Sequence, residues 1–250
     1  MGYLTAENIN KTFGNNKILE NVSIHLDEGE IVSLLGVSGG GKSTLFNILS
    51  GLDTPDNEDG KVILNGKDIT GKPGEISYML QKDLLQPHYT VLDNIILPLT
   101  IKKGMKKKDA RKEAESYFEF FGLAGTQKKY PHQLSGGMKQ RAALLRTYLA
   151  SEGVALLDEP FSALDTITKT AVHSWYLGIM KEIKLSTLFV THDIEEAILL
   201  SDRIYILSGK PGRISDEIAI KLPEPKESRN TLSPEFLSYK RQIIEEIASI

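Results

Sequence analysis

Hydrophobic and polar residues alternate along the first part of the chain, and this pattern predicts antiparallel strands with one solvent-facing side. Within residues 3–33, the apolar side chains of residues 22–26 point one way and the polar side chains between them point the other. A turn at residues 27–30 leads into residues 31–35, a run that is apolar except at Ser33 and is typical of a buried strand. A helix is expected at residues 42–50, directly after a glycine-rich loop.

The rest of the chain alternates between strand-like and helix-like patterns. Residues 61–69 indicate a short hairpin with a type I′ turn at Asn65-Gly66. Helical spacing of apolar residues dominates residues 85–146, which predicts an inserted helical segment. Strands that alternate with helices predict a mainly parallel sheet covered on both faces. Further strands are expected at residues 76–80, 154–157, 187–190 and 203–207, and further helices at 165–184, 194–200 and 234–247.

Composition narrows the classes of function. The chain has 250 residues, of which 40% are hydrophobic and 25% charged, as in ordinary globular proteins. Its formal net charge of −3 gives no indication of nucleic-acid binding, which usually needs a basic balance. The absence of cysteine excludes disulfides and thiolate sites. The apolar runs are too short for a membrane span and the N-terminus does not resemble a signal peptide, so a cytoplasmic location is expected.

The segment G-V-S-G-G-G-K-S matches the phosphate-loop pattern G-x-x-x-x-G-K-[ST], between an expected strand and an expected helix. Backbone N–H groups of such a loop surround phosphate oxygens, and side chains there would block the approach. Lys42 would reach the outer phosphates, and Ser43 would place a hydroxyl on Mg²⁺. A chance glycine turn is the alternative. The residues expected to hold the phosphates are Gly36, Val37, Ser38, Gly39, Gly40, Gly41, Lys42, Ser43 and Thr44.

Acidic and histidine side chains follow two later strands. Asp158 and Glu159 come directly after residues 154–157, and ligands of open α/β sheets bind at the carboxyl ends of strands. Two neighbouring acids there can hold Mg²⁺ through its water shell and orient or deprotonate a water. His192 can donate a hydrogen bond to a γ-phosphate. A solvated loop and a structural histidine are the alternatives, and the remaining histidines are assigned to that structural or exposed class: His25, His88, His132 and His173.

A second glycine-rich stretch, L-S-G-G-M-K-Q-R at residues 134–141, lies far from the first and contains no acid. Together with G-V-S-G-G-G-K-S, Gln81, L-L-D-E-P, S-A-L-D and Thr191-His192, it resembles the ATP-binding subunit of ABC transporters. The order and spacing match over residues 3–215, and L-S-G-G-x-x-Q-R is the most specific element. The implied fold is α/β: a P-loop NTPase core with a mainly parallel sheet, an N-terminal antiparallel β subdomain and an inserted helical subdomain.

The resemblance also implies a division of the chain. It would form one ABC ATP-binding domain over residues 1–250, with a core at 1–84 and 147–221. The helical insertion would take up residues 85–146, and a C-terminal tail would follow at 222–250.

The resemblance implies a head-to-tail dimer in which two ATP molecules are shared between subunits. Ser135, Gly136 and Gly137 of one chain would present a hydroxyl and backbone N–H groups to the γ-phosphate held by the other chain. A carboxylate at this place would repel the nucleotide, which accounts for the lack of acids. Asp165 matches the loop that crosses to the other subunit. ATP would hold the pair closed, and hydrolysis would let it open.

Other positions take their roles from the same resemblance. Phe13 matches the aromatic residue that stacks on adenine, with core packing as the alternative. Gln81 matches the residue that reaches Mg²⁺ and the attacking water, so the metal set is Ser43, Gln81 and Asp158. Glu159 matches the general base and His192 the switch histidine.

The later part of the chain indicates the kind of transporter. Residues 207–214 and 233–237 are similar to importer ATPases of the nitrate, sulfonate and taurine group, which also includes carriers of thiamine precursors. Segment 82–95 would receive a helix of the membrane subunit through Leu84, Leu85, Tyr89, Val91 and Leu92, unless these only pack the insertion. The lysine-rich run 102–112 is expected to be a solvated helix face, with contact to anionic lipid as the alternative.

The resulting prediction is an ATP-hydrolysing subunit of an importer for a small organic or anionic nutrient. It would use ATP and Mg²⁺, form a homodimer, and sit on the cytoplasmic face of the membrane. Its partners would be transmembrane permease subunits and a separate solute-binding protein, and no nucleic acid. The alternatives are an export or lipid-extraction ATPase, a soluble ABC ATPase outside transport, and a P-loop regulator without turnover.

Overall fold

The computed structural model describes residues 3–162 and 165–248, and its N-terminal part forms a four-stranded antiparallel sheet of order β2-β1-β4-β5. Alternation along β1 buries Leu4, Ala6 and Ile9 on one side, as the pattern predicts. Asn65 and Gly66 have φ of 47° and 76°, which fits the predicted type I′ turn between β4 and β5. The strands are β1 (Leu4–Phe13), β2 (Asn16–Leu26), β4 (Lys61–Leu64) and β5 (Lys67–Asp68).

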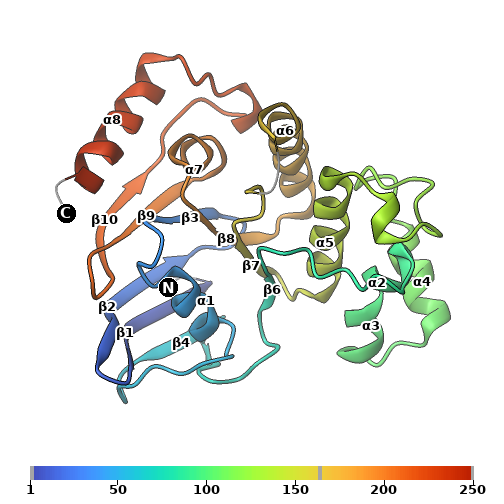
Figure 1. Cartoon of the computed structure of the whole chain (residues 1–250), viewed down its shortest axis with the longest axis horizontal. Helices are drawn as coiled ribbons and strands as arrows, with labels where there is room; N and C mark the ends of the chain where they lie inside the picture. Colours follow the sequence, from blue (N-terminus) through green and yellow to red (C-terminus); the bar gives the residue numbers. More distant parts are fainter. Residues whose placement is uncertain (1–2, 163–164, 249–250) are drawn as a thin grey trace.

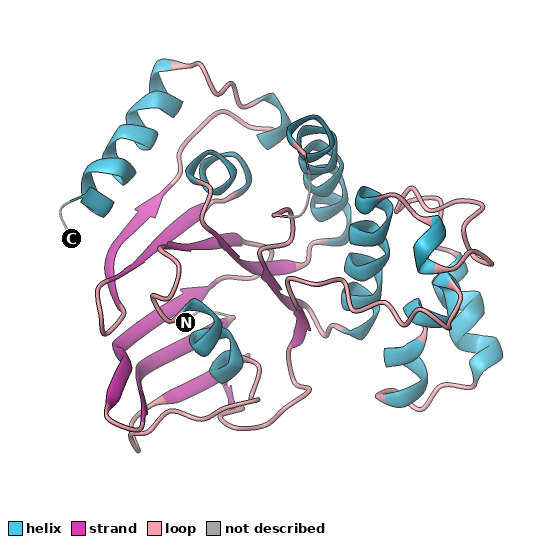
Figure 2. Cartoon of the chain, in the orientation of Figure 1, coloured by secondary structure: helices cyan, strands magenta, loops and turns pink. Residues whose placement is uncertain are grey.

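A second sheet of six strands forms the centre of the molecule, in the order β10-β9-β3-β8-β7-β6 (Figure 2). All neighbours in it are parallel except β10, which runs antiparallel to β9 at the edge. The strand β10 was not among the expected strands, because its sequence R-I-S-D-E-I-A is mostly charged or exposed. The strands are β3 (Ile31–Gly36), β6 (Ser77–Met79), β7 (Val154–Asp158), β8 (Ser186–Thr191), β9 (Arg203–Ser208) and β10 (Arg213–Ala219).

The central sheet is covered on both faces, and β3 shows how its side chains divide between them. Val32 and Leu34 belong to the core shared with the small sheet and helix α1 (Lys42–Leu49). Ile31 and Leu35, which point the other way, join cores formed with helices of the opposite face. Because both faces of such a strand are buried, apolar residues occur at consecutive positions rather than at alternate ones. The fold class predicted from the sequence is confirmed.

Between β6 and β7, every regular element that the structure describes is helical, and these helices lie together at one side of the molecule (Figure 1). The core of these helices is continuous with that of α6 and includes Phe118. Phe121 contacts Trp175 of α6 edge-to-face. Helix α5 runs on to Ala150, past the predicted boundary at residue 146. The helices are α2 (Val91–Ile95), α3 (Leu97–Ile101), α4 (Lys107–Glu115), η1 (Pro131–Gln133) and α5 (Gly136–Ala150).

The C-terminal segment returns across the large sheet and packs on helix α7. Arg229 is buried, and its Nη1 donates hydrogen bonds to the carbonyls of Ile198 and Ser201 at 2.9 Å and 2.8 Å, at the end of that helix. Phe236 and Ile243 of α8 fill the core beside it. The remaining helices are α6 (Thr166–Ile183), α7 (Ile194–Leu200), η2 (Lys226–Ser228) and α8 (Pro234–Ala248).

Candidate nucleotide-binding and catalytic site

The carboxyl ends of four neighbouring strands, β6, β7, β8 and β3, bring the predicted site residues to one edge of the large sheet. The register sets Asp158 of β7 beside Val190 of β8, and Leu35 of β3 beside Thr191 of β8. The loops that leave these ends are therefore neighbours, as expected for the ligand edge of an open α/β sheet. They carry the glycine loop, Gln81, Glu159 and His192.

The glycine loop takes a conformation that side chains would disturb. Gly41 has a φ of 95°, and a Cβ added to it would lie 2.7 Å from Cδ2 of Leu19. At the start of the loop, a Cβ on Gly36 would lie 2.4 Å from the carbonyl oxygen of Leu207. Among the residues that the structure describes, no side chain caps the N-terminus of α1, which begins at Lys42. The first backbone N–H groups of that helix are thus available to an anion.

Lys42 lies inside the loop that precedes it. Its ammonium donates hydrogen bonds to the carbonyls of Gly36 and Val37 at 2.7 Å and 2.9 Å. Burial lowers the pKa of Lys42, and the nearby carboxylates of Glu159 and Asp158 offset this effect only in part. The side chain is therefore held at the centre of the site, with its charge only partly solvated.

A cavity of about 350 Å³ lies between the glycine loop and the acids. Three predicted loop residues, Gly36, Val37 and Gly40, do not line this cavity. The carbonyls of Gly36 and Val37 bind the Lys42 ammonium, and the N–H of Gly40 donates to the carbonyl of Val37 at 3.2 Å. Ile18 also lines the cavity and was not predicted, because an apolar residue within a strand carries no sequence signal of binding. The other lining residues are Ser38, Gly39, Gly41, Lys42, Ser43, Thr44, Gln81, Asp158 and Glu159.

The Glu159 carboxylate stands between two nitrogen donors at the wall of this cavity. Nε2 of Gln81 donates to its Oε2 at 3.0 Å, and Nδ1 of His192 lies 3.1 Å from its Oε1. The backbone of Glu159 has a φ of 45°, unusual for a residue with a side chain. Its N–H donates to the carbonyl of Val190 at 3.1 Å, which ties this conformation to the neighbouring strand. Such strain is typical of functional sites.

Asp158 is half-buried beside Glu159 and contacts Tyr78. The Tyr78 hydroxyl donates to Oδ2 of Asp158 at 3.3 Å. Burial raises the pKa of Asp158, and the charge of Glu159 adds to that effect, whereas Tyr78 and Lys42 counteract it. Tyr78 was not predicted as a site residue, since it looks like any aromatic residue of a buried strand. Together with the Ser43 hydroxyl and the Gln81 amide, Asp158 offers the oxygen ligands that Mg²⁺ prefers.

Phe13 ends strand β1, and 53% of it is exposed. The Lys11 ammonium lies 5.3 Å from the centre of its ring, but the ring is absent from the buried core. This exposure argues against the core-packing alternative and leaves a ring face available for stacking.

The second glycine stretch forms the start of α5 and lies outside the cavity. The Ser135 hydroxyl caps the helix by accepting a hydrogen bond from the N–H of Met138 at 3.3 Å. Ser135 and Gly136 are exposed, and Gly137 is buried against α6. Within the described part of the chain, none of these three residues lines the cavity of the phosphate loop.

Asp165 caps α6 by accepting a hydrogen bond from the N–H of Thr168 at 3.1 Å. The predicted S-A-L-D loop includes Ala163 and Leu164, which lie outside the described residues.

The segment expected to meet a membrane subunit is only partly exposed. Leu84 and Tyr89 are exposed, but the other three predicted contact residues are buried in the core of the helical part: Leu85, Val91 and Leu92. For those three, the alternative of ordinary packing is correct, because Val91 and Leu92 face inward from the short helix α2. Two carbonyls of the segment, those of Asp83 and Leu84, accept hydrogen bonds from Arg146 at 2.5 Å and 3.0 Å.

Two cations of the lysine-rich run pair with a single carboxylate. Lys107 and Arg111 lie 3.0 Å and 2.8 Å from Oδ1 of Asp93. Burial alone would raise the pKa of Asp93, but hydrogen bonds from Arg111, Lys107 and Thr90 outweigh it and lower the pKa to about 2. These side chains are at the surface, as expected for a solvated helix face.

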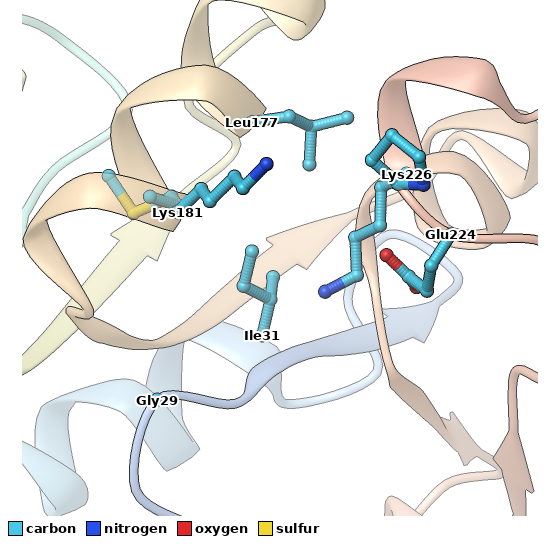
Figure 3. A pocket seen from close by; sticks show the side chains of 8 residues that line it. Gly29, Ile31, Leu177, Lys181, Glu224 and Lys226 are labelled. Carbon is cyan, nitrogen blue, oxygen red and sulfur yellow. The ribbon is translucent and has the colours of Figure 1, made fainter.

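A second cavity, of about 450 Å³, lies at the opposite end of β3 (Figure 3). Leu177 and Lys181 reach it from α6, and Glu224 and Lys226 from the C-terminal segment, with Ile31 at its base. Its described lining contains no glycine-rich loop and no start of an α-helix, so it lacks the backbone N–H groups with which a phosphate loop surrounds a triphosphate. The phosphate-loop cavity is therefore the candidate nucleotide site.

Fold and site together define a P-loop protein that binds a nucleoside triphosphate, and comparisons with known proteins refine this class. The family model described as ABC transporter matches residues 19–162. The formylaminopyrimidine import ATP-binding protein ThiZ of Halalkalibacterium halodurans is 42% identical over 96% of this chain and 94% of that protein. The nitrate import ATP-binding protein NrtD of Synechocystis sp. is 36% identical over 96% of this chain and 93% of that protein.

A solved structure of similar fold is a dimeric ATP-binding cassette in a post-hydrolysis state, bound to ADP and Pi. It is 31% identical, has a TM-score of 0.73, and is matched over 87% of this chain and 99% of its own. The chain belongs to the ABC transporter family. The predicted resemblance is thereby confirmed, as is the prediction that the chain is an ABC-type ATPase.

Proposed function

We propose that the chain hydrolyses ATP to drive a membrane importer of a small organic or anionic nutrient. The observation that carries this proposal is the Glu159 carboxylate, which lies between Gln81 and His192 at the wall of the cavity that contains Lys42. Further support comes from relatives whose names describe import of formylaminopyrimidine, nitrate and aliphatic sulfonates.

Each side chain of the cavity has a distinct task in this proposal. The glycine loop and the start of α1 bind the phosphates through backbone N–H groups, and Lys42 neutralises their charge. Glu159 accepts a proton from the attacking water, and His192 holds the carboxylate and the γ-phosphate in place. Phe13 supports the adenine ring.

Mg²⁺ fits the oxygen donors at one side of the cavity. Ser43, Gln81 and Asp158 would hold it directly or through water. When bound, the ion supplies neutralisation of charge on the phosphates. The pKa of Asp158, raised by burial, would fall beside such a cation, because opposite charge favours the carboxylate.

Two chains would complete each site. Ser135 and Gly136 are exposed at the start of the 15-residue helix α5 and lie outside their own chain's phosphate cavity. They would bind the γ-phosphate that the other chain holds, and the twofold arrangement would create two equal sites. The dimeric state of the related cassette supports this arrangement.

The partner in the membrane would contact the exposed part of segment 82–95, where Leu84 and Tyr89 are exposed. No helix among the described residues is long and apolar enough to cross a bilayer. By analogy with the import ATP-binding proteins to which it is similar, the chain would act as a peripheral subunit on the cytoplasmic face, beside permease subunits and a separate solute-binding protein.

Phosphate release from Mg-ATP by the full chain and by Glu159→Gln tests the proposed reaction. Gln keeps the volume and one acceptor oxygen but removes the base, so turnover should fall at least roughly 100-fold. ATP binding should persist, and gel filtration should detect a dimer trapped by ATP. Wild-type turnover in Glu159→Gln would remove Glu159 from its role, and absence of phosphate release by the wild-type chain bound to its permease would exclude the function.

A further inference from the structure

A buried group of polar side chains lies directly behind His192 and takes no part in the reaction proposed above. At its centre is Glu196 of α7, of which only 4% is exposed. A carboxylate buried to this degree is costly unless hydrogen bonds and opposite charge compensate it. The partners of Glu196 come from two other elements, the helix α6 and the end of strand β8.

Two side chains of α6, those of His173 and Lys169, lie beside the Glu196 carboxylate. Nε2 of His173 lies 3.0 Å from Oε1 of Glu196, and Nζ of Lys169 lies 3.7 Å from the same atom. Burial lowers the pKa of Lys169, but Asp193 and Glu196 raise it more strongly, so the side chain is a cation near neutral pH. His173 also packs edge-to-face on Phe161 at 4.8 Å, two residues after Glu159.

At the end of β8, the hydroxyl of Thr191 donates a hydrogen bond to Oε2 of Glu196. Thr191 is the residue directly before His192. The same hydroxyl accepts a hydrogen bond from the N–H of Asp193, directly after His192, at 3.0 Å. Asp193 in turn pairs with Lys169 at 2.7 Å and accepts the N–H of Glu196 at 3.1 Å. The backbone on both sides of His192 is thus tied to one buried carboxylate.

We propose that Glu196 is a positioning residue, which holds His192 against Glu159 through the Thr191 hydroxyl and fixes α6 to the same point. The inference rests on the proposed role of His192. Shifting only α6 or only the His192 loop would remove part of the compensation of the buried carboxylate, so the network favours movement of the two together. Since Asp165 caps the start of α6, the network links the loop expected to cross to the second subunit with the histidine proposed to contact the γ-phosphate.

Replacing Thr191 separates positioning from stability. Thr191→Val removes the bridging hydroxyl, whereas Thr191→Ser keeps it. Thr187→Val is a matched control, because Thr187 is also buried in β8 but bonds to the carbonyl of Leu185 instead. The measurements are kcat and KM of ATP hydrolysis by the full chain, with the Tm of each variant.

Thr191→Val should lower kcat roughly 10- to 100-fold, because small displacements of a group at the reaction centre have effects of this size. The KM for ATP should change little, since the glycine loop is untouched, and Thr191→Ser should restore most of kcat. Thr187→Val should lower the Tm without a comparable loss of kcat. Equal kcat in Thr191→Val and Thr187→Val, or a kcat that follows Tm across all variants, would overturn the proposal.

Glu196→Gln carries the test if Thr191→Val does not fold. The amide keeps the volume but turns one acceptor into a donor facing Thr191 or His173, so kcat should again fall while KM is retained. Wild-type kcat in this variant would overturn the proposal. Two reference measurements separate the positioning role from the proposed function. Absence of phosphate release by the wild-type chain bound to its permease would exclude the function, and wild-type turnover in Glu159→Gln would remove Glu159 as the base. If Glu159→Gln is inactive but Thr191→Val and Glu196→Gln keep the wild-type kcat, only the positioning role fails.

Discussion

Oε1 of Glu159 lies 3.1 Å from Nδ1 of His192, which joins the ends of the neighbouring strands β7 and β8. The two residues lie 33 positions apart in the chain, and the parallel pairing of β7 with β8 brings the two strand ends together. His192 is 59% exposed at its side chain, whereas Glu159 is 18% exposed. The imidazole is therefore largely accessible to solvent beside Glu159, although His192 is not among the residues that line the cavity.

His192→Ala should abolish most of the turnover and leave ATP binding nearly intact. The loss should be roughly 100-fold or more, as for removal of one donor at a developing charge. His88→Ala is a suitable control for the isolated chain, because His88 is exposed and outside the cavity. Phosphate release and ATP titration measure both effects. Equal turnover in the two variants would show that His192 has no part in the reaction.

Gly41→Ala should weaken ATP binding more than its effect on stability explains. The added Cβ meets Leu19 at 2.7 Å, so the loop or the side chain must shift, and each cost of about 1.4 kcal/mol in binding is tenfold in Kd. Gly29→Ala shares the positive φ but meets nothing within 4 Å, and should only lose about 1 kcal/mol of stability. Unchanged ATP affinity in Gly41→Ala would show that the loop tolerates a side chain.

Asp93→Asn should reduce stability near neutral pH, and the difference should disappear in acid. The folded pKa of Asp93 is about 2, below the usual value of about 3.9 in an unfolded chain. Its stabilising contribution is therefore complete above about pH 5 and mostly lost once the pH has fallen to about 2. Because the ion pairs are partly exposed, about 1 kcal/mol is expected, measured by urea unfolding of both proteins. A difference that persists at pH 2 would contradict this assignment.

Ser135→Arg should block hydrolysis while each chain still binds ATP. The residue is exposed at the start of α5, so a large side chain there should leave the fold intact. It would obstruct only a nucleotide presented by another chain. A titration with ATP, a Tm and a phosphate-release assay distinguish these effects. Normal turnover would argue against a shared site.

The sequence predicted the order of strands and helices well, because the strands of the large sheet are apolar at nearly every position and the loops carry strong glycine signals. It did not predict β10, whose mostly polar and exposed residues are typical of exposed loops. It also placed Leu85, Val91 and Leu92 on a docking surface, although the helical part needs them for its core. Periodicity alone cannot tell a buried face from a face covered by a partner.

The site was predictable where a motif fixes the spacing, as in the glycine loop. Contacts between segments distant in the chain were not. His173 was assigned a structural or exposed role, and nothing in the sequence shows that it lies 3.0 Å from Glu196. Likewise, the φ of 45° at Glu159 follows from its bond to Val190 in the next strand, not from any local preference.

Mixing two inactive variants tests most directly whether each ATP is held by two chains. Lys42→Ala disables the phosphate loop, and Gly136→Arg disables the second glycine-rich stretch at residues 134–141. Neither homodimer then has a competent site. A mixed dimer would have one site with both parts intact, and hydrolysis should return to roughly half of the wild-type rate per mixed dimer if the sites act independently. If mixed dimers form but hydrolyse no ATP, the two segments do not act across a dimer interface, and the proposed arrangement is wrong.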